Sequence, residues 1–206
     1  MGVAIRTAGE DDREPVVRLL DEAFQDDPVS GWVFPGAEYR RTTHSRLMAA
    51  FTDAVLAEGR IDVTEDGTAC ALWLSVPAAD PAGDHADHAA DEEPAQMREA
   101  VDPDNERVEL IARLMAEIHP ADQAHAYLWM IGVAPGQQGR GLGTALIAAA
   151  LDRCDRAGLP AYLEASNARS RVLYERLGFE FTGRALTLPD GPTMWPMWRE
   201  PRSALR

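Results

Sequence analysis

The chain has 206 residues, 46% of them hydrophobic, and a formal net charge of −14 at pH 7. This length predicts one domain, residues 1–206, large enough to bury roughly 70% of its unfolded surface without a metal or a disulfide. The acidity disfavours nucleic acids and anionic membranes as partners and is compatible with a cationic small molecule. No run reaches the roughly 20 apolar residues of a membrane span, and the N-terminus turns acidic too early for a signal peptide, so we expect a cytoplasmic protein. We also expect it to be a monomer or a homodimer.

Residues 1–76 predict a strand, two helices and a hairpin. Alternation over 3–7 indicates a strand, and an acidic helix start follows, with apolar residues at helical spacing (Val16, Val17, Leu20 and Phe24). A second helix is expected over roughly 38–58. The Asp66-Gly67 pair between β-like runs 60–65 and 68–76 is the strongest short hairpin signal that a sequence offers.

Two aromatic residues, Trp32 and Phe34, fall between these helices, in a segment that we expect to be a loop. Aromatic side chains in such a loop can line a substrate pocket. The alternative is that both cover the core beneath the loop, and the sequence does not separate the two.

The segment from about 77 to 104 is predicted to be a mobile acidic insertion, because it is rich in Asp, Glu, Ala and Pro and poor in large apolar residues. His85 and His88 with Asp84 and Asp87 could be compared with a metal site. A solvated acidic loop explains them better, and we predict no metal.

The second half predicts a helix, a β-α-β unit, another helix and a closing hairpin. The two strands of the β-α-β unit should be parallel, with a right-handed crossover. Gly158 ends the helix of that unit, and Gly178 ends the helix that Asn167 caps. The predicted ranges are 105–119 for the first helix, 126–134 and 161–166 for the two strands, 167–177 for the last helix, and 179–188 with 193–199 for the hairpin.

The stretch from Ala126 to Gly143 contains the sequence pattern that is most specific for a function. It is an apolar strand, a glycine-rich loop and the start of a helix. Gly139, Gly141 and Gly143 remove Cβ atoms where a ligand must come close. The first turn of the helix leaves backbone N–H groups unpaired, and the helix dipole adds positive potential, so the loop suits a pyrophosphate.

The spacing separates three glycine-loop chemistries. An NTPase loop needs Lys and then Ser or Thr after its last glycine, but Gly141 is followed by Leu-Gly. A dinucleotide fingerprint lacks its third glycine at Thr144, yet Glu164 lies near the ~20-residue distance of a ribose-binding acid, so this alternative stays open as the weaker one. The pattern Q-x-x-G-x-G is complete in Gln138, Gly141 and Gly143.

This third pattern resembles the acetyl-coenzyme A (acetyl-CoA) loop of the GNAT superfamily of acyltransferases. The order of predicted elements is similar to the GNAT fold over essentially the full length. The resemblance implies an α/β fold with a single mixed sheet flanked by helices, in which the central strand parts from the strand carrying Glu164 to admit acetyl-CoA. AFQDDP, PAYLEASNARSRVLYERLGF and LPDGPTMWPMWR look like the puromycin N-acetyltransferase branch, whereas 31–60 and 78–105 depart from it.

The resemblance also implies site residues. The pantetheine arm of acetyl-CoA would pair with the backbone of Ile131, Gly132 and Val133. Its pyrophosphate would meet the loop N–H groups, with Arg140 adding charge at the rim. Asn167 would bond the pantetheine arm, and Tyr174 would face the thioester sulfur. The implied loop residues are Gln138, Gly139, Arg140, Gly141, Leu142, Gly143 and Thr144.

Acetyl transfer to an amine requires three functional groups. A base removes a proton from the amine, a hydrogen-bond donor stabilises the negative thioester oxygen, and an acid gives a proton to the leaving thiolate. Glu164 is the candidate for orienting and deprotonating the amine; a structural carboxylate bonded to backbone is the alternative. A backbone N–H near Gly132 or Val133 is the candidate oxyanion donor. Tyr174 is the candidate acid, with a core aromatic residue as the alternative.

The sequence therefore predicts an acetyl-CoA-dependent N-acetyltransferase for the amine of a small molecule, with an aminonucleoside-type antibiotic as one candidate acceptor. Two other functions remain as alternatives. One is an acetyl-CoA-binding module without catalysis, and the other is an NAD(P)-dependent oxidoreductase.

Overall fold

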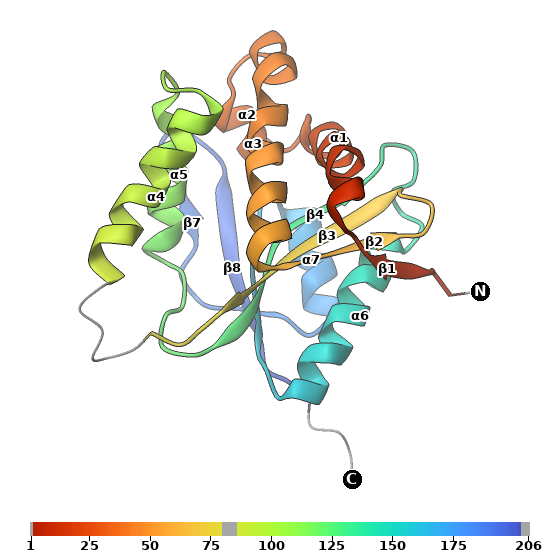
Figure 1. Cartoon of the computed structure of the whole chain (residues 1–206). Coiled ribbons are helices and arrows are strands. Elements are labelled where there is room, and N and C mark those ends of the chain that lie inside the picture. Colours follow the sequence, from red (N-terminus) through yellow and green to blue (C-terminus); the bar gives the residue numbers. More distant parts are fainter. Residues whose placement is uncertain (1, 80–85, 203–206) are drawn as a thin grey trace.

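The computed structural model describes residues 2–79 and 86–202 (Figure 1). Within them, eight strands form one mixed sheet in the order β1-β2-β3-β4-β5-β8-β6, and β7 pairs with β8 beside this path. Helices α1 and α3 pack on one face together with α2, α4 and α5, while α6 and α7 cover the other. The predicted α/β fold with a single mixed sheet flanked by helices is confirmed.

The strands include the three pairings that the sequence predicted. They are β1 (Ile5–Thr7), β2 (Arg60–Thr64), β3 (Ala69–Val76), β4 (His125–Val133), β5 (Ala161–Ala165), β6 (Glu180–Phe181), β7 (Leu186–Thr187) and β8 (Thr193–Arg199). The first hairpin is confirmed, since β2 and β3 are antiparallel and Gly67 takes the φ of 68° that the turn needs. The β-α-β unit is confirmed by the parallel pairing of β4 with β5. The closing hairpin joins β7 to β8, but β8 then runs along β5.

The helices differ from the prediction in two places. They are α1 (Arg13–Phe24), α2 (Pro28–Val33), α3 (Ala37–Glu58), α4 (Ala86–Val101), α5 (Glu106–Ala116), α6 (Leu142–Ala157) and α7 (Ala168–Arg176), with a 3-10 turn at Glu10–Asp12. Residues 28–33 form a helix where a loop was expected, because the Asp27 carboxylate accepts the N–H of Val29 at 2.9 Å and Pro28 suits a first helical position.

The second difference is α4, which lies inside the segment predicted to be a mobile insertion. Met97 and Val101 belong to the core that α3 and α5 also form, and Val101 is fully buried. This core contact stabilises a helix that composition alone did not predict. Asp84 and His85 lie outside the described residues, as do the side chains of Asp87 and His88. Among the described side chains, no group of three or more His, Cys, Asp or Glu gathers as a metal site would.

Alternating residues of the sheet divide the interior into two cores. Cys70 and Leu72 of β3 face the core of α1 and α3, whereas Ala71 and Trp73 face the core of α6 and α7. Burial raises the pKa of the Cys70 thiol to about 12, so it stays a neutral packing group. None of the described helices is long and apolar enough to cross a membrane.

One irregularity in the sheet positions the site. Strand β4 pairs with β3 along its whole length, but its pairing with β5 ends at Leu128 and Leu163. Beyond this point residues 129–133 have no partner on β5 among the described residues. The register of β4 against β3 also shifts at Trp129, which is left without a partner on β3. The strands therefore part at the carboxyl end of β5, as predicted.

Candidate active site

A cavity of about 1690 Å³ opens at the gap between β4 and β5. It extends from the glycine loop to the helices α3, α4 and α5. Most of the predicted site residues line it, so the fold brings together positions that lie far apart in the sequence. Those that line it are Ile131, Val133, Gln138, Gly139, Gly141, Leu142, Gly143, Thr144, Glu164, Asn167 and Tyr174.

The glycine loop forms one end of this cavity. Gly139 and Gly141 take φ values of 77° and 82°, and a Cβ built on either would meet no atom within 4 Å. These glycines therefore leave open space and adopt a backbone that other residues rarely reach. No side chain caps α6. The first helical bond there is from the Ala145 N–H to the Gly141 carbonyl, so the preceding N–H groups have no acceptor within the helix.

Two of the predicted cofactor residues do not line the cavity. A Cβ at Gly132 would lie 3.1 Å from Leu20 Cδ2, so this glycine lets α1 pack closely on β4. Arg140 is exposed, and its guanidinium donates to the Gln137 Oε1 at 2.5 Å. Arg169 and Arg176 of α7 line the cavity instead and place positive charge on its wall.

Trp32 and Phe34 are a correction to the predicted acceptor site. Their exposed fractions are 6% and 0%, and neither lines the cavity. The Trp32 indole donates to the Pro189 carbonyl at 2.8 Å, and Phe34 packs edge-on against His44. Because α2 replaces the expected loop, both rings turn into the core, which was the alternative interpretation. Their neighbours Val29 and Val33 reach the cavity.

Glu164 stands where the strands part. Its side chain is 2% exposed, and its Oε2 accepts the Tyr127 hydroxyl at 2.7 Å. Its Oε1 has no hydrogen-bond partner among the described residues, and Nδ1 of His119 lies 3.7 Å from it. Burial, followed by the charge of Glu164, raises the pKa of Tyr127 well above 10, so Tyr127 keeps its proton and remains a donor. One oxygen of the carboxylate is held while the other is left for chemistry.

Tyr174 lies on α7 across the same cavity and is 6% exposed. Its hydroxyl makes no hydrogen bond within the described part of the chain. Burial, with a smaller contribution from Asp27, raises the pKa of Tyr174 above its ordinary value of 10. The phenol is therefore protonated at neutral pH and free to donate to a bound molecule.

The end of β5 is tied to α2 and α7 by polar side chains. The Ser166 hydroxyl donates to Asp27 Oδ2 at 2.7 Å, and the Asn167 side chain accepts the Ser170 N–H at 2.9 Å as the cap of α7. The Asn167 amide also donates to Ser166 at 3.3 Å. These contacts fix Asn167 at the cavity wall.

The opposite end of the cavity is mostly apolar. Its wall comes from Phe51 of α3, Met97 of α4, Ile111 and Met115 of α5, and Trp129 of β4. Phe51 and Trp129 pack with ring centres 4.4 Å apart. This wall was not predicted, because its members come from separate helices and carry no motif. His119 and Tyr127 were also missed, although the register of Tyr127 beside Tyr162 follows from two parallel strands.

Ser30, His44 and Asp21 form a hydrogen-bonded chain at the edge of the cavity, separate from the Tyr127–Glu164 contact. His44 lies 3.0 Å from the Ser30 hydroxyl and 2.7 Å from Asp21. The nearby N–H groups of Val29 and Ser30 are taken by Asp27, so they cannot stabilise an oxyanion. We interpret this chain as the contact that holds α2 against α1 and α3.

Comparison with known proteins agrees with this geometry. A model of the acetyltransferase (GNAT) family matches residues 68–179, more than half of the chain and including the glycine loop, Glu164 and Tyr174. The chain belongs to the acetyltransferase (GNAT) family. The finer resemblance to the puromycin N-acetyltransferase branch is not shown by these comparisons.

Curated relatives match over short stretches. The mycothiol acetyltransferase of Beutenbergia cavernae is 48% identical over 61 residues, which cover 28% of this chain and 20% of that protein. The mycothiol acetyltransferase of Streptomyces scabiei is 39% identical over 74 residues, covering 34% of this chain and 24% of that protein. The chain thus spans about a fifth to a quarter of the length of these relatives.

Solved structures share the fold over nearly the full length. A protein from Corynebacterium glutamicum, described as histone acetyltransferase HPA2 and related acetyltransferase, has a TM-score of 0.72 at 24% identity and covers 100% of both chains. Arylalkylamine N-acetyltransferase 2 from Aedes aegypti has a TM-score of 0.65 at 14% identity, covering 98% of this chain and 100% of that one. At these identities the likeness shows the GNAT fold alone.

Proposed function

We propose that this GNAT protein transfers the acetyl group of acetyl-CoA directly to the amine of a small molecule with an apolar body. One observation carries the proposal. A strand edge left open by the parting of β4 and β5 meets an uncapped helix N-terminus and a buried carboxylate in one cavity. These are the parts that an acetyl carrier and an amine need within reach of each other.

The described residues fit acetyl-CoA. Residues 131–133, which have no partner on β5, would offer backbone groups to the amides of the pantetheine arm, and the N–H groups of Gly143 and Thr144, which precede the first helical bond, would bind its pyrophosphate. Arg169 and Arg176 would add charge for its phosphates. When bound, acetyl-CoA supplies the thioester that the amine attacks.

Glu164 is the proposed base. Tyr127 holds its Oε2, so Oε1 is the oxygen that can accept a proton from the amine. A buried carboxylate also favours the bound ammonium electrostatically before that proton leaves. The proposed role therefore includes both positioning and deprotonation.

Tyr174 is the proposed donor to the leaving thiolate. A phenol whose pKa lies above 10 holds its proton more tightly than a thiol does. We therefore expect it to stabilise the thiolate mainly as a hydrogen-bond donor. A backbone N–H near Gly132 or Val133 remains the proposed oxyanion donor, because the end of β4 has an unpaired edge.

The wall formed by Phe51, Met97 and Met115 supports the apolar part of the proposal. A hydrophobic pocket with a few polar groups at one end selects ligands of the same pattern. We therefore propose amines that carry an aromatic or branched aliphatic body as preferred acceptors. Aminonucleosides, suggested by the puromycin branch, remain one candidate within that class.

The test is release of coenzyme A from acetyl-CoA with a panel of amines. The panel contains arylalkylamines, aliphatic amines, polyamines, amino sugars and puromycin. We expect turnover with apolar amines and little with polyamines or amino sugars. A preference for polyamines would contradict the apolar acceptor, and no release above blank with any amine would contradict catalysis.

Calorimetric titration distinguishes the alternatives. Binding of acetyl-CoA without any release of coenzyme A would support a binding module. Binding of NAD or NADP in place of acetyl-CoA would support the oxidoreductase.

A further inference from the structure

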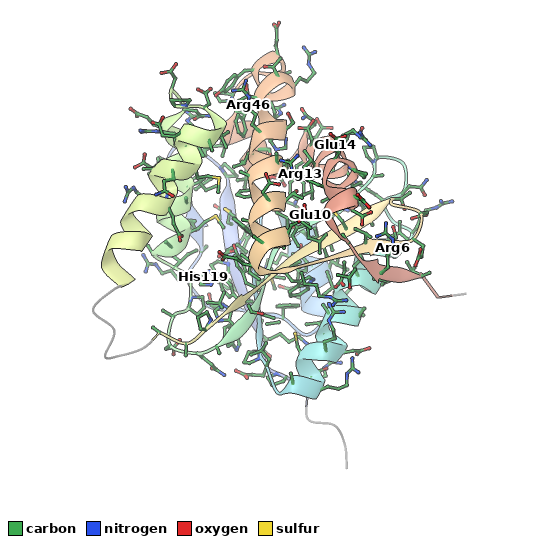
Figure 2. All side chains as sticks on the ribbon, viewed as in Figure 1. Arg6, Glu10, Arg13, Glu14, Arg46 and His119 are labelled. Atoms are coloured by element: carbon green, nitrogen blue, oxygen red, sulfur yellow. The ribbon has the colours of Figure 1, made fainter. Side chains whose placement is uncertain are left out.

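His119 lies where the chain leaves α5 and turns toward β4, below the helices α4 and α5 in the view of Figure 2. Its ring is packed edge-on against Tyr127 and Tyr162, with ring centres 4.7 and 4.8 Å away. The side chain lines the cavity and is 21% exposed. The two tyrosines therefore hold the imidazole in one orientation, while part of it stays accessible to water.

His125 determines which nitrogen of this imidazole carries hydrogen. Its own Nδ1 lies 2.8 Å from the Gln123 carbonyl oxygen, which can only accept, so Nδ1 must be an N–H. Burial, the largest cause, lowers the pKa of His125, and its ring is therefore neutral with a bare Nε2. That bare nitrogen lies 3.0 Å from Nε2 of His119. His119 must donate, so its Nε2 carries hydrogen.

The other nitrogen of His119 then faces Glu164. Nδ1 lies 3.7 Å from Oε1, the carboxylate oxygen that lacks a hydrogen-bond partner among the described residues. Two lone pairs that face each other in a buried site repel, whereas one proton between them gives a charge-assisted contact. Nδ1 of His119 and Oε1 of Glu164 therefore form a site for one proton.

We propose that His119 takes from Glu164 the proton that the acceptor amine loses, and that His125 is the positioning residue that keeps His119 able to do so. This inference rests on the proposed acetyl transfer. The proton leaves the ammonium nitrogen for Oε1, passes to Nδ1 of His119, and leaves that ring for water. Glu164 is again a carboxylate when the next amine arrives. Transfer across 3.7 Å needs a small closing movement or one bridging water.

The groups that face His119 come from each strand packed against it. These are His125 and Tyr127 of β4 and Tyr162 and Glu164 of β5. Burial raises the pKa of both tyrosines, so both remain neutral. Of these four groups, Glu164 alone places negative charge beside His119.

Nitrogen-15 NMR of the histidine rings tests the hydrogen-bond chain without any turnover. The chain has five histidines, so single substitutions can assign the signals. We expect the neutral ring of His125 to carry hydrogen on Nδ1 alone and the neutral ring of His119 to carry it on Nε2. A neutral His119 with hydrogen on Nδ1 and a bare Nε2 would overturn the proposal.

Kinetics test the relay itself. His119→Phe keeps a ring between the two tyrosines, and we expect it to lower kcat/KM for the amine by about 10²-fold while acetyl-CoA binds as before. In His119→Ala, added imidazoles should restore turnover in proportion to their basicity. Equal rescue by a non-basic ring such as pyrazole would show that only packing was lost, and the relay would be wrong.

His125 offers a matched pair of variants. His125→Gln can still present an oxygen to Nε2 of His119, whereas His125→Phe cannot. We expect about a tenfold loss of kcat/KM and an altered acid limb for the Phe variant, with partial recovery in the Gln variant. Identical profiles for the two variants would contradict the positioning role. A wild-type protein that releases no coenzyme A would overturn the proposed function as well, whereas normal turnover of His119→Phe overturns the relay alone.

Discussion

The two ends of the cavity are built in different ways. The proposed acetyl-CoA end consists mainly of backbone from one continuous stretch, residues 131–144, with left-handed glycines and free N–H groups. The proposed acceptor end consists of side chains from α3, α4, α5 and β4, which are separate in the sequence. Ligand binding at the first end would depend on backbone conformation. At the second end it would depend on which side chains come together when the chain folds.

Because of this difference, we expect amino-acid substitutions to affect the two ends in different ways. A backbone site tolerates most side chains but not a change in dihedral preference, since its ligand contacts are main-chain N–H groups. A side-chain site can change its ligand by single substitutions while the fold persists. We therefore expect variants of the two ends to separate cleanly into effects on acetyl-CoA and effects on the amine.

Glu164→Gln should give the largest effect, because it removes the proposed base from the boundary between the two ends. We expect kcat/KM for the amine to fall by about 10² to 10⁴-fold, with the affinity for acetyl-CoA nearly unchanged. Steady-state kinetics and calorimetry measure the two quantities. Glu175→Gln removes an exposed carboxylate of α7 and serves as the control. Wild-type rates in the Glu164→Gln variant, with chemistry rate-limiting, would remove Glu164 from catalysis.

Tyr174→Phe should have the next largest effect, toward the lower end of about 10² to 10⁴ in kcat, because a thiolate is a good leaving group without help. The ring and its packing stay, so stability and acetyl-CoA affinity should hold. Since burial raises the pKa of Tyr174, the donor form persists beyond pH 10, and any loss of rate from its ionisation lies above that pH. A pH profile of kcat unchanged by the substitution would show a packing residue only.

Gly141→Val should weaken acetyl-CoA binding by about 10²-fold, because it adds strain at a φ of 82° and fills the space beside the helix N-terminus. The fold should persist, as judged by circular dichroism. Gly183→Val is a matched control, with a φ of 95°, open space around it and no place in the cavity. Equal acetyl-CoA affinity in the two variants would place the pyrophosphate elsewhere.

Met97→Ala should have the smallest effect and should act on the amine alone. Loss of apolar contact is worth about 0.8 kcal/mol per buried CH₂, so we expect KM for an apolar amine to rise by up to about tenfold. KM for acetyl-CoA should not change. Met97→Leu restores the volume and should recover most of the affinity. A rise in KM for acetyl-CoA would mean that the two ends are not separate.

The sequence predicted that the glycine loop would lie at a site, and most of the loop residues line the cavity, because the requirements of such a loop are local. Gln138, Gly141 and Gly143 stand at fixed spacing between a strand and a helix, and that spacing needs no knowledge of distant residues. Glu164 and Asn167 followed because they end the next strand and begin the next helix. Three strand pairings followed in the same way from hairpin and β-α-β signals: β2 with β3, β4 with β5, and β7 with β8.

The acceptor end could not be predicted, because it depends on tertiary contacts. Nothing in the composition of α4 shows that Met97 and Val101 have core partners. The six-residue α2 is too short for a periodic pattern, so Trp32 and Phe34 were assigned to a loop. The role proposed for His119 depends on its contacts with His125 of β4 and Glu164 of β5, and these contacts form only in the folded chain.

The extra residue at Trp129 determines which face of the sheet each later side chain of β4 points to. Before it, Tyr127 faces the helices α3 to α5 and Leu128 faces α6; after it, Met130 and Gly132 face the first side while Ile131 and Val133 face the second. A regular strand would reverse the positions after Trp129, placing Ile131 under α1 and a glycine against α6. The inserted residue thus lets one strand present aromatic side chains to the acceptor and a bare backbone to α1 within a few positions. The length of this strand, as well as the glycine at position 132, therefore determines how α1 and the cavity side chains are placed.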